Sequence, residues 1–252
     1  MKRPGKTKDE MAERLTEREK ARYERSIRVE GFGEEAQERL RAARVLVVGA
    51  GGLGSAVLQY LAAAGVGTLG IVECDTVSES NLQRQVLYTD ADLNRPKVEA
   101  AARRVEALNP AAWVVTYPDR LTEENAAEIL AGFDIVADCT DNYPTRYVID
   151  RTAGRLRMPM VYGTAQDAGG QVSVFHAEGA GSYADLYPEP EPNRPERPIG
   201  VLSPVPGIVG SIQAMEVVKL ATGFGRPLAG RLLVLDALAM ECTVFDLPGG
   251  KE

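Results

Sequence analysis

A glycine-rich turn follows a short apolar segment and could bind phosphate. The apolar segment ends at Val48, and the chain then reads Gly49-Ala-Gly51-Gly52-Leu-Gly54 before a helix-compatible stretch. Such glycines allow a tight turn and a close approach of ligand to backbone, while N–H groups at the start of a helix face an anion. The pattern predicts nucleotide binding, but it suits NAD and ATP equally. Glu73, which ends the next predicted strand, would accept the ribose hydroxyls of either nucleotide.

Three polar segments further along the chain distinguish between these nucleotides. They are residues 78–85 with Asn81, Arg84 and Gln85, residues 95–97 with Lys97, and residues 138–142 with Asp141. If the sheet is doubly wound, all three segments reach its carboxyl edge, where ligands bind. Arg84 and Lys97 can neutralise phosphate charge, and the amides of Asn81 and Gln85 can add uncharged hydrogen bonds. A hydride-transfer site has little use for this set, so the pattern favours a triphosphate.

Asp141 predicts a divalent cation at the same edge. A carboxylate beside ATP would repel the phosphates unless a cation lay between them, and Mg²⁺ prefers oxygen ligands. We therefore expect Asp141 to bind Mg²⁺. The alternative is that Asp141 and Asn142 only cap the helix that follows. Asp75, two residues beyond Glu73, is a further candidate for nucleotide contact.

The elements that must position these residues alternate along the first half of the chain. The residue pattern predicts strands at 44–49, 68–73, 113–117 and 135–137, and helices at 55–64, 97–108 and 123–130. This alternation is typical of a mainly parallel sheet that is covered by helices on both faces.

The pattern changes in the second half of the chain. Residues 171–175 alternate in a way that suits an antiparallel strand, and residues 178–206 are rich in Gly, Pro and Glu and predict an irregular loop. A helix at 207–220 and strands at 232–235 and 243–247 follow. The predicted fold class is α/β: a Rossmann-like, doubly wound mixed sheet, largely parallel, with antiparallel additions in the C-terminal half.

Composition limits the chemistry that the chain can perform. Its 252 residues carry a formal net charge of -7 and include one histidine, His176, and three cysteines, Cys74, Cys139 and Cys242. The negative charge opposes binding to nucleic acid, and a single histidine, which we expect to be structural, excludes a histidine-rich metal site. No apolar run is long enough to span a membrane, so we expect no membrane association and a cytoplasmic protein without disulfides.

Several short motifs, in order, resemble the ThiF/MoeB/HesA family of bacterial relatives of ubiquitin-activating enzymes. The likeness covers about residues 22–247. The matching segments are Arg22-Tyr-Glu-Arg25, Gly49 to Gly54, Ser80-Asn-Leu-Gln-Arg-Gln85, Arg95-Pro-Lys97, Asp138-Cys-Thr-Asp-Asn142 and Gly210-Ser-Ile-Gln-Ala-Met-Glu216.

The resemblance implies an activity and a set of residue roles. The activity is ATP- and Mg²⁺-dependent adenylation of the C-terminal Gly-Gly carboxylate of a ubiquitin-like sulfur-carrier protein, ThiS- or MoaD-like, with release of pyrophosphate. The family implies a ribose contact for Glu73, where relatives usually carry aspartate. It implies triphosphate contacts for Asn81, Arg84 and Lys97, and a Mg²⁺ contact for Asp141. Arg25 matches an arginine that the family contributes to the neighbouring subunit's ATP site, so the resemblance implies a homodimer.

Composition and the resemblance together predict the domain organisation. Residues 1–25 alternate Lys, Arg and Glu with few large apolar residues and predict a charged N-terminal arm, and the resemblance implies a single adenylyltransferase domain at 26–247. Its nucleotide-binding half spans about 44–165, and its carrier-binding half spans about 166–247. Residues 248–252 form a predicted flexible tail, because Lys251 and Glu252 follow Gly249-Gly250 and make it a poor match to a carrier terminus.

The chain departs from the family pattern at its cysteines. Many relatives bind structural zinc through two Cys-x-x-Cys pairs, but the first position reads Ser182-Tyr-Ala-Asp185 here and the C-terminus lacks cysteine, so we expect no zinc. The loop at 191–206 also lacks the cysteine that takes up the acyl group in many relatives. An NAD-dependent oxidoreductase and an ATP-dependent tRNA-base dehydratase remain alternatives. The sequence names neither the pathway (thiamine, molybdopterin, cysteine or another) nor the sulfur donor.

Overall fold

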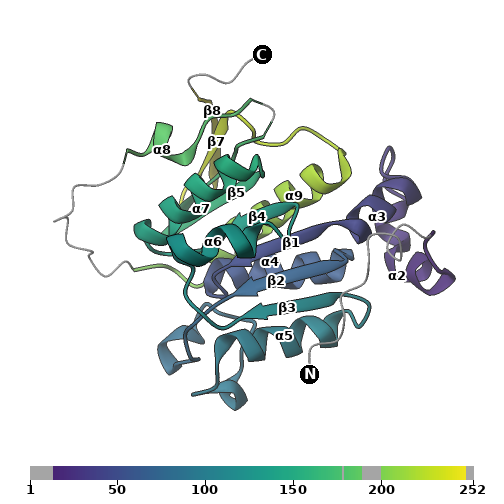
Figure 1. Cartoon of the computed structure of the whole chain (residues 1–252), viewed down its shortest axis with the longest axis horizontal. Helices are drawn as coiled ribbons and strands as arrows, with labels where there is room; N and C mark the ends of the chain where they lie inside the picture. Colours follow the sequence, from purple (N-terminus) through teal and green to yellow (C-terminus); the bar gives the residue numbers. More distant parts are fainter. Residues whose placement is uncertain (1–13, 178, 189–199, 248–252) are drawn as a thin grey trace.

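One eight-stranded sheet organises the protein (Figure 1). A computed structural model describes residues 14–177, 179–188 and 200–247, so the predicted tail at 248–252 and part of the predicted arm and loop lie outside the described residues. The strand order is β3-β2-β1-β4-β5-β6-β7-β8. The strands are β1 (Arg44–Val48), β2 (Thr68–Val72), β3 (Trp113–Tyr117), β4 (Ile135–Asp138), β5 (Met160–Gln166), β6 (Gly169–Phe175), β7 (Arg231–Asp236) and β8 (Glu241–Asp246). Strands β1 to β5 are parallel and β6 to β8 are antiparallel, which confirms the predicted fold class.

Helices cover both faces of the sheet (Figure 1). One face packs against α4 (Gly52–Ala64), α5 (Lys97–Leu108) and α9 (Pro204–Thr222), and the other packs against α6 (Glu123–Leu130), α7 (Tyr143–Leu156) and α8 (Tyr183–Leu186). Helices α2 (Glu17–Ile27) and α3 (Gly33–Ala42) precede β1, and two short 3-10 helices, η1 (Glu79–Asn81) and η2 (Asp90–Asp92), follow β2. None of the helices formed by the described residues is long and apolar enough to cross a membrane.

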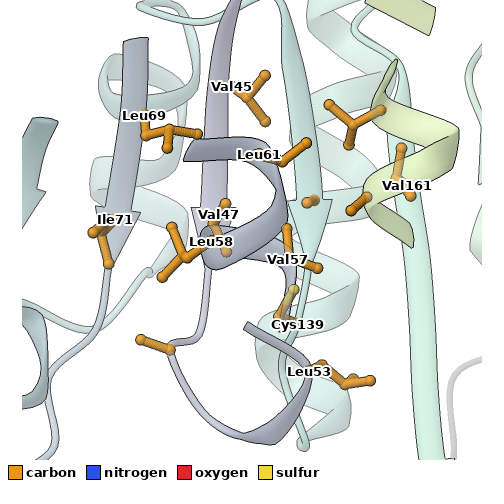
Figure 2. Close-up of a cluster of buried hydrophobic side chains, with 14 of the residues drawn as sticks. Val45, Val47, Leu53, Val57, Leu58, Leu61, Leu69, Ile71, Cys139 and Val161 are labelled. Atoms are coloured by element: carbon orange, nitrogen blue, oxygen red, sulfur yellow. The ribbon is translucent and has the colours of Figure 1, made fainter. Parts of the chain in front are cut away.

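Strand β1 lies at the centre of the sheet and is buried on both faces. Its side chains alternate, so Val45 and Val47 pack with Leu58 of α4 on one face (Figure 2), while Leu46 packs with Leu130 of α6 on the other. A central strand buried on both faces reads as a continuous apolar run, which is the pattern seen at residues 45–48.

The strand order reverses direction beside β1. Strand β1 pairs with β2 at one of its edges and with β4 at the other. The helix that follows β1, α4, and the helix that follows β4, α7, cover opposite faces of the sheet. Open α/β sheets bind their ligands at such a reversal point, at the carboxyl ends of the strands, which here are the ends of β1 and β4. The glycine turn follows β1 at this edge, and Cys139 follows β4.

Helix α2 ties part of the charged arm to the rest of the protein. Leu15 and Tyr23 are buried, and the Tyr23 hydroxyl accepts a hydrogen bond from Asn109 Nδ2 at 2.8 Å. The expected boundary between residues 25 and 26 therefore falls inside α2. The helices at 33–42 and 183–186 are absent from the sequence prediction, the second because it lies in a stretch rich in Gly, Pro and Glu.

Candidate functional site

The glycine turn has no room for a side chain at Gly49, at Gly54 or at Gly52, where a Cβ atom would lie 2.9 Å from Pro206 Cβ. Gly49 has a φ of 92°, and a Cβ atom there would lie 2.7 Å from the Cys139 carbonyl oxygen. A Cβ atom on Gly54 would lie 2.0 Å from the Gly49 carbonyl oxygen. Within the described part of the chain, the N–H groups of Gly52 and Leu53 make no hydrogen bond. The first turn of α4 thus presents free donors, which is the arrangement that binds an anion.

Two side chains hold the backbone of the turn at Ala50. Its N–H group donates to Glu73 Oε2 at 2.9 Å, and its carbonyl oxygen accepts from the buried Tyr88 hydroxyl at 2.8 Å. Glu73 Oε1 accepts the N–H group of Asp75 at 2.9 Å. Each carboxylate oxygen has a second lone pair, so Glu73 can still accept two ribose hydroxyls. Burial strongly raises the pKa of Tyr88, with the Glu73 carboxylate adding to the shift, so the phenol stays a neutral donor.

The segment around η1 lies against the glycine turn. A Cβ atom on Gly52 would lie 3.5 Å from Arg84 Cγ, and one on Gly51 would lie 3.6 Å from Gln85 Nε2. Arg84 donates to the Ser80 carbonyl oxygen at 3.1 Å, and Asn81 Oδ1 accepts the Ser78 N–H at 3.3 Å.

The Gln85 side chain is the most buried polar group of this segment. It is 4% exposed, and its Oε1 atom has no hydrogen-bond partner among the described residues. A buried polar atom normally has a partner, so an acceptor left open here fits a site that is completed by a bound molecule.

Lys97 reaches the same edge from the first residue of α5. It is 5% exposed, and its Nζ atom lies 3.4 Å from Asp75 Oδ2. The Lys97 N–H group also donates to the Asp75 carbonyl oxygen at 2.9 Å, which fixes the start of the helix beside the end of β2. A nearly buried lysine that pairs with a single exposed carboxylate can offer its remaining donors to a phosphate.

Asp141 lies on the turn that follows β4. Asn142 alone caps α7, because its Oδ1 atom accepts the Thr145 N–H at 3.0 Å. Asp141 is exposed and makes no hydrogen bond or ion pair with any residue that the structure describes. Capping therefore does not account for Asp141, and its carboxylate is available to a ligand.

A buried ion pair lies beneath this turn. Asp138 is fully buried, and its Oδ2 atom accepts from Arg146 Nε at 2.8 Å, while Oδ1 accepts from the Thr140 N–H and hydroxyl. Burial by itself would lower the pKa of Arg146, but the attraction of the Asp138 carboxylate outweighs burial and raises the pKa above its ordinary value, so the guanidinium stays charged. Arg146 and Tyr88 are not among the residues predicted from the sequence. For Arg146 the available signal was its spacing from Asp138 across the start of a helix, and nothing in the sequence pointed to Tyr88.

Arg25 lies at the opposite end of the molecule from the glycine turn. It is exposed in the last turn of α2, whose Tyr23 ring packs against Gly65, the residue that caps the far end of α4. The 13 residues of α4 span about 20 Å at 1.5 Å per residue. Figure 1 shows α2 beyond the amino ends of β1 and β2. Arg25 therefore does not reach the glycine turn of its own chain.

The remaining predicted residues come together. The turn at 49–54, the carboxylates at 73 and 75, the amides and arginine at 81–85, Lys97 and the turn at 139–141 all lie at the carboxyl edge of β1, β2 and β4. Free helix N–H groups and two cations suit phosphate, Glu73 suits ribose, and the open Gln85 acceptor leaves a place for a ligand donor. This donor set fits a nucleotide triphosphate, and the free Asp141 carboxylate fits Mg²⁺.

Ser182 and Asp185, which depart from the family pattern, and the single histidine, His176, all have structural roles. Ser182 and Asp185 cap α8 reciprocally: Asp185 N–H donates to Ser182 Oγ at 3.1 Å, and Ser182 N–H donates to Asp185 Oδ2 at 2.8 Å. His176 Nε2 lies 2.8 Å from the buried Asp150 carboxylate, on the face of the sheet covered by α7.

Known proteins resemble this chain over most of its length. The ThiF family model matches residues 23–251. A sulfur carrier protein adenylyltransferase of Thermus thermophilus is 48% identical over 233 residues, which are 89% of this chain and 86% of that protein. A molybdopterin-synthase adenylyltransferase of Haemophilus influenzae is 45% identical over 240 residues, which are 94% of this chain and 99% of that protein. The crystal structure of PaaA has a TM-score of 0.78 at 25% identity and covers 92% of this chain and 75% of its own.

Proposed function

This chain belongs to the ThiF family, and from that premise we propose that it uses ATP to adenylate the C-terminal carboxylate of a ubiquitin-like sulfur-carrier protein. The observation that carries the proposal is the meeting of the glycine turn with Arg84, Lys97 and Asp141 at one sheet edge. A dinucleotide used for hydride transfer would need the turn and Glu73 but not a free carboxylate for a metal. An NAD-dependent oxidoreductase is therefore the weaker hypothesis of the two.

The names of the relatives support the class of substrate. The Thermus protein is named for a sulfur carrier protein, and the Haemophilus protein is named for molybdopterin synthase. Both are adenylyltransferases, and both align with about nine-tenths of this chain. The net charge of -7 opposes a tRNA substrate, because nucleic-acid affinity depends largely on basic residues that contact phosphate.

The reaction requires positioning and charge neutralisation more than proton transfer. A carboxylate oxygen of the carrier attacks the α-phosphorus of ATP, a new P–O bond forms, and the bond to the β-phosphate oxygen breaks to release pyrophosphate. The attacking carboxylate is already ionised at neutral pH. Two like charges 4 Å apart repel by about 4 kcal/mol near a protein surface, so cations must offset the approach of one anion to another. Arg84 and Lys97 would supply that charge, with Asn81 and Gln85 orienting the nucleotide.

Mg²⁺ would be held by Asp141. When bound, the ion neutralises the phosphate charge that Arg84 and Lys97 do not neutralise. The fit rests on an exposed carboxylate that neither caps α7 nor pairs with another described residue. Structural zinc forms no part of the proposal, because Ser182 and Asp185 hold each other in a capping box.

A second copy of the chain would complete the site. Arg25 lies about one helix length from its own glycine turn, so it can serve the reaction only in the site of a neighbouring subunit. A homodimer in which each subunit lends Arg25 to the other accounts for an exposed arginine that has no ion pair within the described residues.

The proposed reaction ends at the acyl-adenylate. The loop at 191–206 holds no cysteine, and Cys139 is buried with its pKa raised by burial. An outside sulfur donor would then attack the activated carboxyl group.

The deciding experiment is carrier-dependent exchange of labelled pyrophosphate into ATP. Purified ThiS-like and MoaD-like carriers ending in Gly-Gly would each be tested with the wild type, Asp141→Ala and Arg84→Ala. We expect exchange with at least one carrier, and a loss of about a hundredfold or more in each variant, the size expected when an electrostatic contact to the reacting phosphates is removed.

Arg104→Ala and Glu106→Ala are the matched controls, because both residues are exposed on α5 and form no hydrogen bond or ion pair with the site residues that the structure describes. They should retain full exchange. The proposal fails if no carrier supports exchange, or if exchange persists in both site variants.

A further inference from the structure

We propose that Arg146 is a positioning residue for this reaction, which holds the turn at residues 139–141 from its buried side and so fixes the orientation of Asp141. The inference rests on the proposed function, since it assigns the support of one proposed ligand of Mg²⁺. Arg146 itself is 4% exposed and lies beneath the turn, so it acts through the protein and not by contact with substrate.

One guanidinium binds three different segments of the chain. Its Nε atom donates to Asp138 Oδ2 at the end of β4, and its Nη2 atom donates to the Thr140 carbonyl oxygen, both at 2.8 Å. Nη2 also lies 3.4 Å from the Gly163 carbonyl oxygen of β5. These bonds connect the end of β4, the turn and the neighbouring strand, so the turn cannot move independently of the sheet.

Aromatic rings and a glutamine fix the guanidinium and its partner. Arg146 lies over the rings of Tyr162 and Tyr183, with its Cζ atom 4.9 and 5.5 Å from their centroids. Gln213 of α9 donates to the Asp138 carbonyl oxygen at 2.7 Å. The described residues thus leave little freedom to the ion pair, and its geometry is set by the core.

The bond to Thr140 controls the peptide that leads into Asp141. The Thr140 carbonyl and the Asp141 N–H belong to one planar trans peptide, and their bonds point in opposite directions. Arg146 holds the carbonyl towards the protein interior, so the Asp141 N–H points away from it, and this N–H has no acceptor among the described residues. Without Arg146 this peptide could rotate, and the Asp141 carboxylate would sample several directions.

Lysine cannot replace this arrangement. A lysine at 146 would keep the positive charge beside Asp138, but an ammonium group lacks the planar fork that bonds a carboxylate and a carbonyl at fixed angles. Arg146→Lys therefore separates charge balance in the core from orientation of the turn.

The test is a double-mutant cycle on nucleotide binding. The wild type, Arg146→Lys, Asp141→Ala and the double variant would be titrated with a non-hydrolysable ATP analogue by calorimetry, with and without Mg²⁺. We expect Arg146→Lys to weaken binding in Mg²⁺ by about tenfold, but by less than about threefold when Asp141 is already alanine, because residues that act through one another are not additive. Equal losses in both backgrounds, or no loss in either, would overturn the inference.

Ile149→Val is the matched control for general loosening of α7. Ile149 is fully buried on the same helix, and its side chain has no polar atom that could bond to Arg146 or to the turn at 139–141. The loss of one buried methylene should lower the melting temperature and leave affinity in Mg²⁺ unchanged. An equal loss of affinity in Ile149→Val would contradict a specific role for Arg146.

Thermal unfolding of each protein shows whether it is folded at the assay temperature. If Arg146→Lys is not, the variant Asp138→Asn/Arg146→Gln, which removes both buried charges together, takes its place in the cycle with the same expected outcomes. A wild type that binds no ATP analogue would refute the proposed function, whereas a wild type that binds it and shows additive losses would refute only the inference about Arg146.

Discussion

At the scale of single residues, the site depends on glycines that approach other backbone atoms closely. Gly54 lies in the first turn of α4, and a Cβ atom there would overlap the Gly49 carbonyl oxygen. Gly207 lies in the first turn of α9 and has no atom within 4 Å of such a position. Both glycines lie in the first turn of a helix, but only Gly54 lacks the space for a methyl group.

Gly54→Ala should displace the glycine turn and abolish nucleotide binding. The distance of 2.0 Å between the new Cβ atom and the Gly49 carbonyl oxygen cannot be increased without moving backbone, so we expect the free energy of unfolding to fall by about 1–3 kcal/mol or more. Calorimetry with an ATP analogue and denaturant unfolding would measure both effects. Gly207→Ala, the control, should gain about 0.5–1 kcal/mol from helix propensity and keep its affinity. Tight nucleotide binding by Gly54→Ala would contradict the packing described for the turn.

Removal of the cysteines should leave adenylation intact. Cys74 is exposed beside the site, but burial and the Asp75 and Glu73 carboxylates raise its pKa, which disfavours the nucleophilic thiolate. We expect Cys74→Ser and Cys242→Ser to retain carrier-dependent pyrophosphate exchange within about twofold, since the proposed adenylation has no step that uses a thiol. Mass spectrometry of the wild type after turnover provides the complementary measurement. A carrier joined covalently to any of the three cysteines would refute an end point at the acyl-adenylate.

At the scale of elements, a hydrogen-bonded cap holds the start of α8. The segment at 182–185 stands where relatives are expected to carry the first zinc-binding pair, and its side chains satisfy the helix start instead. Tyr183 of this helix is buried against Arg146 and packs edge-on against Phe175, so the cap also anchors the aromatic cluster beneath the turn at 139–141.

A chelator should not destabilise the protein, whereas loss of the cap should. We expect the melting temperature to be the same with and without EDTA, and Ser182→Ala to lower the free energy of unfolding by about 0.5–2 kcal/mol. Thr122, which caps α6 in a similar box with Asn125, offers a comparison away from this segment. A melting temperature that falls on chelation, together with zinc found by elemental analysis, would show that a metal site exists.

The contribution of Asp185 to stability should disappear in acid. The Ser182 N–H and hydroxyl lower the pKa of Asp185, so its folded value lies below its unfolded value. A group with a lowered pKa stabilises the fold above its unfolded pKa of about 3.9, and this stability is lost as the pH falls through the folded value. The difference in melting temperature between the wild type and Asp185→Asn should therefore be constant near neutral pH and shrink below about pH 4. A difference that grows in acid would contradict the assigned bonds.

At the scale of the whole molecule, the residues proposed for the site lie at two opposite ends of one chain. The glycine turn and Asp141 lie at the carboxyl edge of the sheet, and Arg25 lies beyond the amino edge. A subunit arrangement that joins the two edges between copies would give two equivalent sites for each dimer.

Mixing two inactive variants should restore activity if Arg25 acts in the neighbouring subunit. Arg25→Ala and Asp141→Ala should each lose exchange when pure. After subunit exchange, half of the dimers are mixed and each mixed dimer holds one intact site, so about a quarter of the wild-type activity should return. Pyrophosphate exchange measured against the mixing ratio tests this, with light scattering to give the oligomeric state. Mixtures that stay inactive although mixed dimers form would refute the shared site.

The local pattern of the sequence was sufficient for elements whose burial follows their own periodicity. Residues 97–108, 113–117 and 123–130 form the predicted helix, strand and helix with the same bounds. Helix α3 was missed because its residues 33–42 are mostly polar and charged. Its buried side includes Gln37, which donates to the Ala64 carbonyl oxygen of α4, and Leu40, so contacts with α4 and α9 and not an apolar stripe decide which side is buried.

The sequence by itself determined the fold class and the edge at which the site lies. Parallel strands that alternate with helices bring the segments after β1, β2 and β4 to one edge, so glycine spacing and residue type were enough to predict which side chains would gather there. The tertiary structure alone decided what supports them. Tyr88 bonds to Ala50 across 38 residues and Gln213 bonds to Asp138 across 75, and buried polar partners so far apart leave no local periodicity to read. Folding pairs them because a polar group removed from water must find a partner wherever the packed chain provides one.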